Sequence, residues 1–189
     1  MKILVLGGAG YIGSHTVYRL IESGNEVVVF DNLETGHIEA VHPKAKFYKG
    51  DLRNRSEIDS VFDKEKGIDA VIHFAANSLV GESMTNPLKY YDNNLNSLIN
   101  LLDVMIKHNC KKIVFSSSAT VYKETKELPF KESSEKLPCN PYGYTKLIGE
   151  KILEDVYISD NDFSIAILRY FNPIGCHESG MIGENVNDI

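Results

Sequence analysis

The feature that most constrains this chain is a glycine-rich turn near its beginning. Residues 3–6 are apolar, and residues 7–13 follow directly with the sequence GGAGYIG. A tight turn needs a positive φ angle, and backbone that approaches a phosphate closely has no room for a Cβ atom. A helix that opens at the turn offers free N–H groups and the positive end of its dipole. After a strand and before a helix, this spacing predicts a dinucleotide site at Gly7, Gly10 and Gly13.

The rest of the chain alternates short apolar runs with longer segments of helical periodicity. Strands are expected at residues 3–6, 27–30, 46–49, 70–74, 113–115 and 165–168, and helices at residues 11–23, 56–66, 86–109 and 140–159. Continuous apolar strands are typical of a parallel sheet that is buried on both faces. The alternation therefore predicts an α/β fold with a doubly wound parallel sheet of the Rossmann type. Ligands of such sheets bind beyond the carboxyl ends of the strands.

Composition excludes several classes of protein. The chain has 189 residues, 43% of them apolar, which is enough for one domain with a sizeable core. A formal charge of −6 without a basic stripe argues against a nucleic-acid partner. Three separated cysteines indicate free thiols in the cytoplasm. No apolar run is long enough for a membrane span, and the six histidines lack metal-ligand spacing, so neither a membrane partner nor a metal is expected.

Two aspartates lie where successive strands are expected to end. Asp31 closes the second strand, roughly 20 residues beyond the glycine turn. A carboxylate there accepts hydrogen bonds from ribose hydroxyls and repels a 2′-phosphate, so the expected cofactor is NAD rather than NADP. The alternative is that Asp31 is only a turn or capping residue. Asp51 follows the third strand and is placed to reach the adenine, although a helix-leading aspartate explains it almost as well.

Candidate catalytic residues lie beyond the fifth strand and in the last helix. Tyr142 and Lys146 are spaced i, i+4, so they share one face of the helix that opens at Pro141. A phenol has an ordinary pKa near 10, and a nearby ammonium lowers it, which would make Tyr142 a general base and acid. Ser118 would hold the substrate oxygen as its proton leaves. The competing interpretation is a surface pair, and only the predicted dinucleotide site favours the catalytic one.

Together these residues resemble the extended short-chain dehydrogenase/reductase family, and within it the 4-epimerases of UDP-hexoses. The matching stretches are residues 7–15 (GGAGYIGSH), 31–33 (DNL), 50–51 (GD), 80–83 (VGES), 90–94 (YYDNN), 116–122 (SSSATVY), 141–143 (PYG) and 169–173 (RYFNP). No single stretch is specific, but the set is. The resemblance implies interconversion of UDP-glucose and UDP-galactose through a 4-keto intermediate, with bound NAD and a UDP-hexose as substrate.

The resemblance also implies roles for individual residues. It makes Ser118, Tyr142 and Lys146 catalytic, and it places Ser118, Tyr142 and Asn172 on the substrate. The cofactor-binding residues that it implies are Gly7, Gly10, Tyr11, Ile12, Gly13, Asp31, Asn32, Leu33, Thr35, Gly36, Asp51, Leu52, Phe74, Ala75, Ala76, Ser78, Asn93, Tyr142, Lys146 and Phe171. Alternatively, Phe171 is an aromatic residue of the core, and Asn172 is a turn residue before Pro173.

The chain departs from the family pattern at several positions. Many members have threonine where this chain has Leu6, and lysine where it has Ser78, and that lysine helps to hold the cofactor. The dehydratases of the family carry an acid and a base where this chain has Ala119 and Thr120, which disfavours dehydration. Another NAD-dependent sugar-nucleotide epimerase or dehydratase remains the rival within the family.

Members of the family continue into a second lobe that closes over the nucleotide sugar. We expect residues 1–172 to form the NAD-binding domain, and residues 173–189 to begin a substrate-binding lobe that is largely missing. By itself the chain is then expected to be weakly active or inactive. A non-catalytic NAD-binding module is the alternative from another class. The resemblance further implies a homodimer in which the helices expected at residues 86–109 and 140–159 pair across the axis.

Overall fold

A parallel sheet forms the centre of the fold in the computed structural model, which describes residues 1–126 and 128–184. Within the described residues the sheet has six strands in the order β3-β2-β1-β4-β5-β6. Their bounds are Lys2–Leu6 (β1), Glu26–Asp31 (β2), Lys46–Lys49 (β3), Ala70–His73 (β4), Lys112–Ser118 (β5) and Ser164–Tyr170 (β6). This order is that of a Rossmann fold, so the predicted fold class is confirmed.

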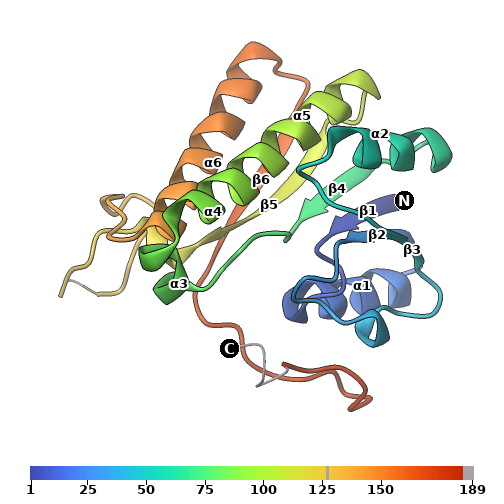
Figure 1. Ribbon diagram of the computed structural model, residues 1–189, viewed down its shortest axis with the longest axis horizontal. Coiled ribbons are helices and arrows are strands. Elements are labelled where there is room, and N and C mark those ends of the chain that lie inside the picture. Colours follow the sequence, from blue (N-terminus) through green and yellow to red (C-terminus); the bar gives the residue numbers. More distant parts are fainter. Residues whose placement is uncertain (127, 185–189) are drawn as a thin grey trace.

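Helices lie on both faces of the sheet, with α2, α5 and α6 on one side and α1 on the other (Figure 1). Their bounds are Tyr11–Glu22 (α1), Arg55–Lys64 (α2), Val80–Thr85 (α3), Pro87–Tyr91 (α4), Ser97–Lys107 (α5) and Pro141–Ser159 (α6), with short 3-10 turns at Ile38–Ala40 (η1) and Ala119–Val121 (η3). In the described parts of the chain, no helix combines the length and the apolar character that crossing a membrane requires.

Strand β5 is longer than the sequence predicts, and this changes the position of Ser118. The expected strand ends at residue 115, which would place Ser118 in the following loop. Instead Ser118 is the last residue of β5 and pairs with Tyr170 of β6. Residues 116–118 are serines, so the end of β5 lacks the apolar pattern from which a strand is predicted. These serines nevertheless pair with residues 168–170 of the neighbouring strand β6.

The helix predicted at residues 86–109 is interrupted by a π turn at Asp92–Asn96 (η2), which joins α4 to α5. A π turn inserts one extra residue into the helical repeat, so side chains on either side of it change face. The polar side chains of Asn94 and Ser97 are buried there, next to the fully buried ring of Tyr90. The short helix α3, which precedes this segment, was not predicted either.

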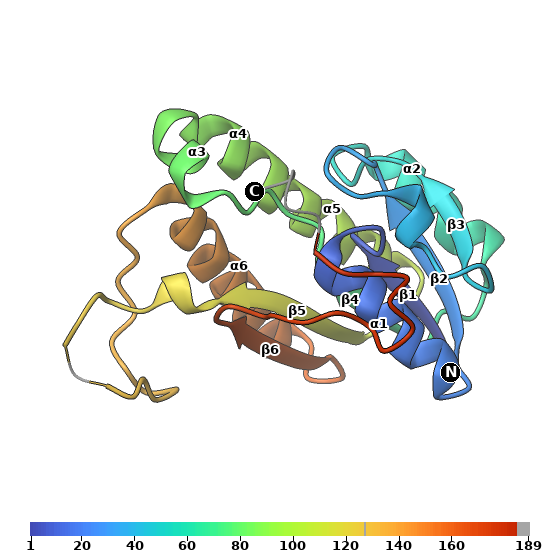
Figure 2. The same cartoon turned by 90° about the horizontal axis from the view of Figure 1, so that it is seen from below.

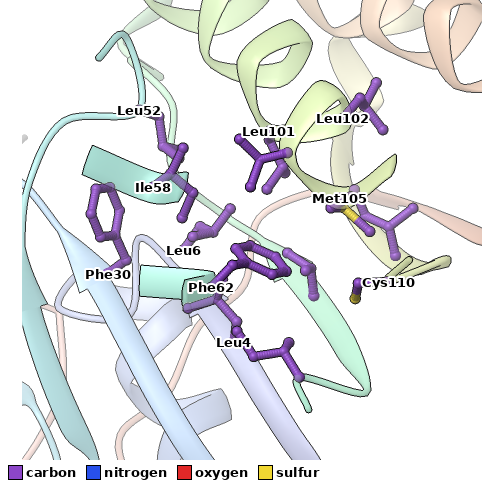
Figure 3. Packing of buried hydrophobic residues seen from close by; sticks show 14 of the residues in the cluster. Leu4, Leu6, Phe30, Leu52, Ile58, Phe62, Leu101, Leu102, Met105 and Cys110 are labelled. Atoms are coloured by element: carbon purple, nitrogen blue, oxygen red, sulfur yellow. The ribbon is translucent and has the colours of Figure 1, made fainter. Parts of the chain in front are cut away.

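Apolar side chains of alternate strand positions fill a core on each face of the sheet. The larger core packs β1 and β2 against α2 and α5, as Figure 3 shows for Leu4, Leu6, Phe30, Ile58 and Leu101. The smaller core packs the opposite faces of β1 and β2 against α1; its buried members are Ile3, Val5, Val17, Val27 and Val29. The central strands are therefore buried on both faces, and their carboxyl ends are held in fixed positions.

Candidate functional site

A cavity of about 670 Å³ lies beyond the carboxyl ends of the strands. Its wall contains residues that directly follow β1, β2, β3 and β4, together with residues of α3, α4, η2 and α6. The cavity therefore lies at the position that the rule for doubly wound sheets gives for a ligand. Its volume is in the range of cofactor-sized sites.

The glycine turn between β1 and α1 forms one end of this cavity. Gly7 has a φ of +76°, and a Cβ atom there would lie 2.6 Å from the backbone N of Ala75. A Cβ atom on Gly13 would collide with the carbonyl oxygen of Gly7. Protein packing alone thus requires glycine at both positions.

Gly10 is different, because the packing of the described residues leaves room beside it. The nearest atom to a Cβ atom built there would be the carbonyl oxygen of Gly7, at 3.5 Å. Gly10 is the N-cap residue of α1 and lines the cavity. A glycine that the fold does not need, at a helix N-terminus and beside an open cavity, fits a pyrophosphate that approaches the backbone closely.

Asp31 is the last residue of β2, and its side chain connects the glycine turn to the loop that follows β2. Its Oδ2 accepts a hydrogen bond from the backbone N–H of Ala9 at 3.0 Å, and its Oδ1 accepts one from that of Leu33 at 2.9 Å. The residue is only 8% exposed, yet it lines the cavity. Each carboxylate oxygen has a second lone pair, so Asp31 can hold the turn and also accept hydrogen bonds from ribose hydroxyls.

Asp51 lines the cavity beyond β3 and is paired with an arginine. The Nε of Arg53 lies 3.0 Å from both carboxylate oxygens of Asp51, and this hydrogen-bonded pair lowers the pKa of the carboxyl. The carboxylate is therefore ionised at neutral pH and partly neutralised by its own loop.

The three candidate catalytic residues come together at the opposite end of the cavity. Tyr142 and Lys146 lie on one face of α6 and line the cavity, and the Ser118 side chain is near enough to the Tyr142 hydroxyl to lower its pKa. Ser118 Oγ also accepts hydrogen bonds from the backbone N–H of Thr120 at 3.2 Å and from its hydroxyl at 2.9 Å. Helix α6 begins where the Asn140 side chain accepts a hydrogen bond from the Gly143 N–H at 2.8 Å, which confirms the predicted cap.

The electrostatics of this group differ from the sequence-based expectation. Burial raises the pKa of Tyr142, and the side chain of Ser118 opposes that shift only in part. Lys146 is fully enclosed; burial lowers its pKa to about 8, and its Nζ donates to the Ser116 carbonyl oxygen at 2.8 Å. The ammonium lies 5.7 Å from the centre of the Tyr142 ring. At that distance it does not offset the loss of water around the phenol.

Most of the residues expected at the cofactor share this cavity. Its wall includes Gly7, Gly10, Tyr11, Ile12, Gly13, Asp31, Asn32, Thr35, Gly36, Asp51, Leu52, Phe74, Ala75, Ala76, Ser78, Asn93, Tyr142 and Lys146. Among the described residues, Leu33, Ser118, Phe171 and Asn172 lie outside this wall. Leu33 contributes its backbone N–H to Asp31 instead. Phe171 is 59% exposed, and its ring centre lies 6.1 Å from that of Phe130.

Other residues line the cavity without having been predicted. They are Phe30, Glu34, Gly50, Asn77, Leu79, Glu82, Lys89, Tyr90, Ser97, Ser116, Pro173 and Glu184. Several lie on the short helices α3 and α4, and no local pattern in the sequence places these helices at the cavity. Glu34 lies between the predicted cofactor residues Leu33 and Thr35, and this position in the sequence could have indicated it.

A buried asparagine of the π turn joins two parts of the wall. The Nδ2 of Asn94 donates to the carbonyl oxygen of Asn77 at 3.0 Å and to Thr145 Oγ1 at 2.9 Å. Its Oδ1 accepts a hydrogen bond from the N–H of Asn77 at 2.9 Å. Asn94 therefore fixes the loop after β4 against the helix that carries Tyr142 and Lys146.

A buried ion pair lies beside the catalytic end of the cavity. Glu150 of α6 is 1% exposed, and its two oxygens accept hydrogen bonds from Nε and Nη2 of Arg169, each at 2.8 Å. The hydroxyl of Ser117 donates to Glu150 Oε1 at 2.6 Å. This group ties β5 and β6 to α6, and it sits next to Ser118 in sequence.

The chain turns back after β6 and runs across α1 (Figure 2). The hydroxyl of Tyr11 donates to the Gly175 carbonyl oxygen at 2.7 Å, and His177 Nε2 lies 3.1 Å from Glu22 Oε1. Pro173 and Glu184 reach the cavity wall. The expected start of a second lobe, residues 173–189, is thus described up to residue 184, and residues 185–189 lie outside the described residues.

Solved structures share this architecture. A crystal structure of a UDP-glucose 4-epimerase matches with a TM-score of 0.94 at 46% identity, and covers 98% of this chain and 56% of that one. The UDP-glucose 4-epimerase of Bifidobacterium longum, solved in complex with NAD+ and UDP, matches with a TM-score of 0.93 at 47% identity, over 98% of this chain and 57% of that one.

Curated sequences give the same family. The chain is 52% identical to the UDP-glucose 4-epimerase of Bacillus subtilis (strain 168), over 100% of its own length and 58% of that protein. It is 55% identical to the UDP-glucose 4-epimerase of Streptococcus mutans, over 98% and 56% respectively. The chain thus spans little more than half the length of these relatives. Residues 3–189 match the NAD dependent epimerase/dehydratase family, and the chain belongs to that family.

Proposed function

We propose that this chain is the NAD-binding part of an enzyme that interconverts UDP-glucose and UDP-galactose by inverting C4 of the hexose. One observation carries the proposal: Tyr142 and Lys146 line the same cavity as the glycine turn, and the side chain of Ser118 acts on the Tyr142 hydroxyl. A module that only bound NAD would not need these three side chains together. The names of the relatives support the choice of substrate.

NAD would lie between the glycine turn and Tyr142. Gly10 and the N-terminus of α1 would take the pyrophosphate, Asp31 the adenosine ribose, and Asp51 the adenine end. When bound, NAD supplies an acceptor and donor of hydride for C4 of the sugar. The remaining assigned cofactor contacts, among them Asn93 and the exposed Phe171, are part of the same proposal.

The chain's own residues would handle the proton of the 4-hydroxyl. As the C4–H bond breaks, the Tyr142 oxygen takes that proton and a 4-keto sugar forms; after the sugar has rotated, Tyr142 returns the proton to the oxygen. Ser118 would hold the sugar oxygen during both transfers. Tyr142 must be ionised before it can accept the first proton, so its raised pKa has to fall when the site is filled. The ammonium of Lys146, 5.7 Å from the centre of the ring, favours the phenolate.

The division into two lobes is also proposed. Strand β6 ends at Tyr170, and the described residues beyond it form neither strand nor helix. We place the end of the NAD-binding domain at residue 172, so that Asn172 would meet the nucleotide sugar where the second lobe begins. Free Cys110, Cys139 and Cys176 support a place in the reducing cytoplasm, where galactose metabolism would use the enzyme.

NAD is expected to bind to the 189-residue chain, and more tightly than NADP. The buried carboxylate of Asp31 lines the cavity and would repel a 2′-phosphate, while ribose hydroxyls can donate to it. Calorimetric titration with each dinucleotide measures the preference. Equal or tighter binding of NADP would contradict the role given to Asp31, and absence of NAD binding would overturn the proposed function.

The chain is expected to form a dimer through α5 and α6. Leu88 of the adjoining helix α4 is 78% exposed, Ile99 and Ile106 of α5 are 45% and 54% exposed, and Ile158 of α6 is 70% exposed. Apolar side chains on neighbouring helices are typical of a surface that a second copy covers. Sedimentation at micromolar concentration should show a dimer, and Ile106→Lys should shift it toward monomer. Monomer alone for the unchanged chain would count against this surface.

A further inference from the structure

A carboxylate that the sequence did not assign to the cofactor lies between two cations at the adenosine end of the cavity. Glu34 Oε2 is 4.0 Å from Nη2 of Arg53, and Glu34 Oε1 is 3.9 Å from Nζ of Lys89. Glu34 belongs to the loop after β2, Arg53 to the loop after β3, and Lys89 to α4. Charges from three separate segments therefore meet at this corner.

The two cations do not depend on Glu34 for a partner. Arg53 is hydrogen-bonded to Asp51, and the Nζ of Lys89 donates to Glu82 Oε1 at 2.8 Å. The cluster has three carboxylates and two cations, so it carries one net negative charge. Without Glu34 it would be neutral, and N–H groups of the guanidinium and the ammonium would be open to another anion.

Glu34 is fixed beside the residue expected to bind the ribose. It follows Asp31 by three positions, and its backbone N–H donates to Asn32 Oδ1 at 2.9 Å. The Nδ2 of Asn32 in turn donates to Glu34 Oε2 at 3.4 Å. Asp31, Asn32 and Glu34 all line the cavity. The carboxylate of Glu34 is thus presented at the same end of the cavity as Asp31.

We propose that Glu34 is a second determinant of the preference for NAD over NADP. Its negative charge opposes a 2′-phosphate, and it occupies the space between Arg53 and Lys89, which would otherwise bind that phosphate. Arginine and lysine are the side chains that sites for phosphorylated ribose use. The proposal rests on the proposed function, because it requires the adenosine of a dinucleotide at this end of the cavity.

Glu34 can be tested more cleanly than Asp31. Asp31 holds the backbone of Ala9 and Leu33, so replacing it would also disturb the glycine turn. The side chain of Glu34 is 45% exposed, and among the described residues it accepts no hydrogen bond from the backbone of another segment. Solvent screens an exposed charge, so its effect on affinity is smaller than that of a buried one.

The test is titration of NAD and NADP into the unchanged chain and into Glu34→Gln. We expect the affinity of Glu34→Gln for NADP to rise by about tenfold, the size of effect that one favourable charge contact produces. Its affinity for NAD should stay within about twofold. Glu39→Gln is the matched control, because Glu39 is exposed on η1, outside the cavity wall, and its replacement changes the net charge equally. Adding Arg53→Ala or Lys89→Met to Glu34→Gln should remove much of the gain.

Unchanged NADP affinity in a Glu34→Gln chain that binds NAD normally would overturn the inference and leave the proposed function intact. The same gain in Glu39→Gln would overturn it too, because the effect would then be one of total charge. Should Glu34→Gln fail to fold, Glu34→Ser provides the same comparison. If the unchanged chain binds no NAD, the proposed function fails and the inference fails with it.

Discussion

The 189-residue chain is expected to bind NAD yet to epimerise UDP-galactose barely or not at all. Hydride transfer requires the sugar C4 to be held close to the nicotinamide, and such positioning supplies on the order of 7–11 kcal/mol in favourable cases. The chain spans 58% of the length of its Bacillus subtilis relative, and we expect the remaining length of such a protein to supply part of this positioning. An assay for UDP-glucose formation measures the rate, and robust turnover by the short chain would contradict the expectation.

Completing the chain with the C-terminal part of that relative should restore turnover, and Tyr142→Phe should then abolish it. Loss of a general acid and base lowers a rate by roughly 10²- to 10⁴-fold. NAD binding should persist, because the substitution removes only the phenolic oxygen. Tyr144→Phe is the matched control, since Tyr144 lies on another face of α6 and is 38% exposed. Normal turnover by Tyr142→Phe in the completed enzyme would show that another group is the base.

Arg169→Met is expected to lower the free energy of unfolding by about 3–5 kcal/mol at neutral pH, the usual effect of removing one member of a buried ion pair. Glu150 is 1% exposed, so without Arg169 its carboxylate would be left in the interior with Ser117 and, at 3.6 Å, Lys136. Urea unfolding of the chain and the variant measures the difference. Equal midpoints and slopes would mean that water or Lys136 compensates for the arginine.

The destabilisation by Arg169→Met should depend on pH. Burial by itself raises the pKa of Glu150, but the hydrogen bonds from Arg169 and Ser117 bring it below its usual value. In the unchanged chain the ionised carboxylate therefore stabilises the fold above the unfolded pKa, and this contribution is lost as the pH falls through the folded value. In the variant burial prevails, the carboxyl takes up a proton more readily, and the difference in stability should shrink toward mildly acidic pH. Replacing Glu150 by leucine as well should recover part of the loss.

Local signals were enough to predict the frame of the site. The glycine turn, the strand that ends at Asp31 and the helix capped by Asn140 each depend on residues close together in sequence. All three are present in the structure. Tyr142 and Lys146 share a face because the helical repeat fixes their spacing.

Features that depend on distant segments were not predicted. An inserted π residue changes the face of Asn94 without altering the kinds of residue around it, and its partners Asn77 and Thr145 come from other elements. The pKa of Tyr142 depends on how much water the fold removes, which the spacing to Lys146 cannot reveal. The charge cluster at Glu34 likewise depends on how two loops and helix α4 are placed in space.

Strand β1 is synthesised before β2 and β4 but lies between them in the sheet. The N–H of Gly7 donates to the Phe30 carbonyl oxygen, and that of Ala75 donates to Leu6, so later residues hold the glycine turn in shape. The catalytic end of the cavity is complete only when Lys146 has left the ribosome. During translation the phosphate-binding turn is therefore synthesised well before the other residues of the cofactor site. We expect a cofactor to bind and stabilise the folded domain, and not to bind the chain while it is being synthesised.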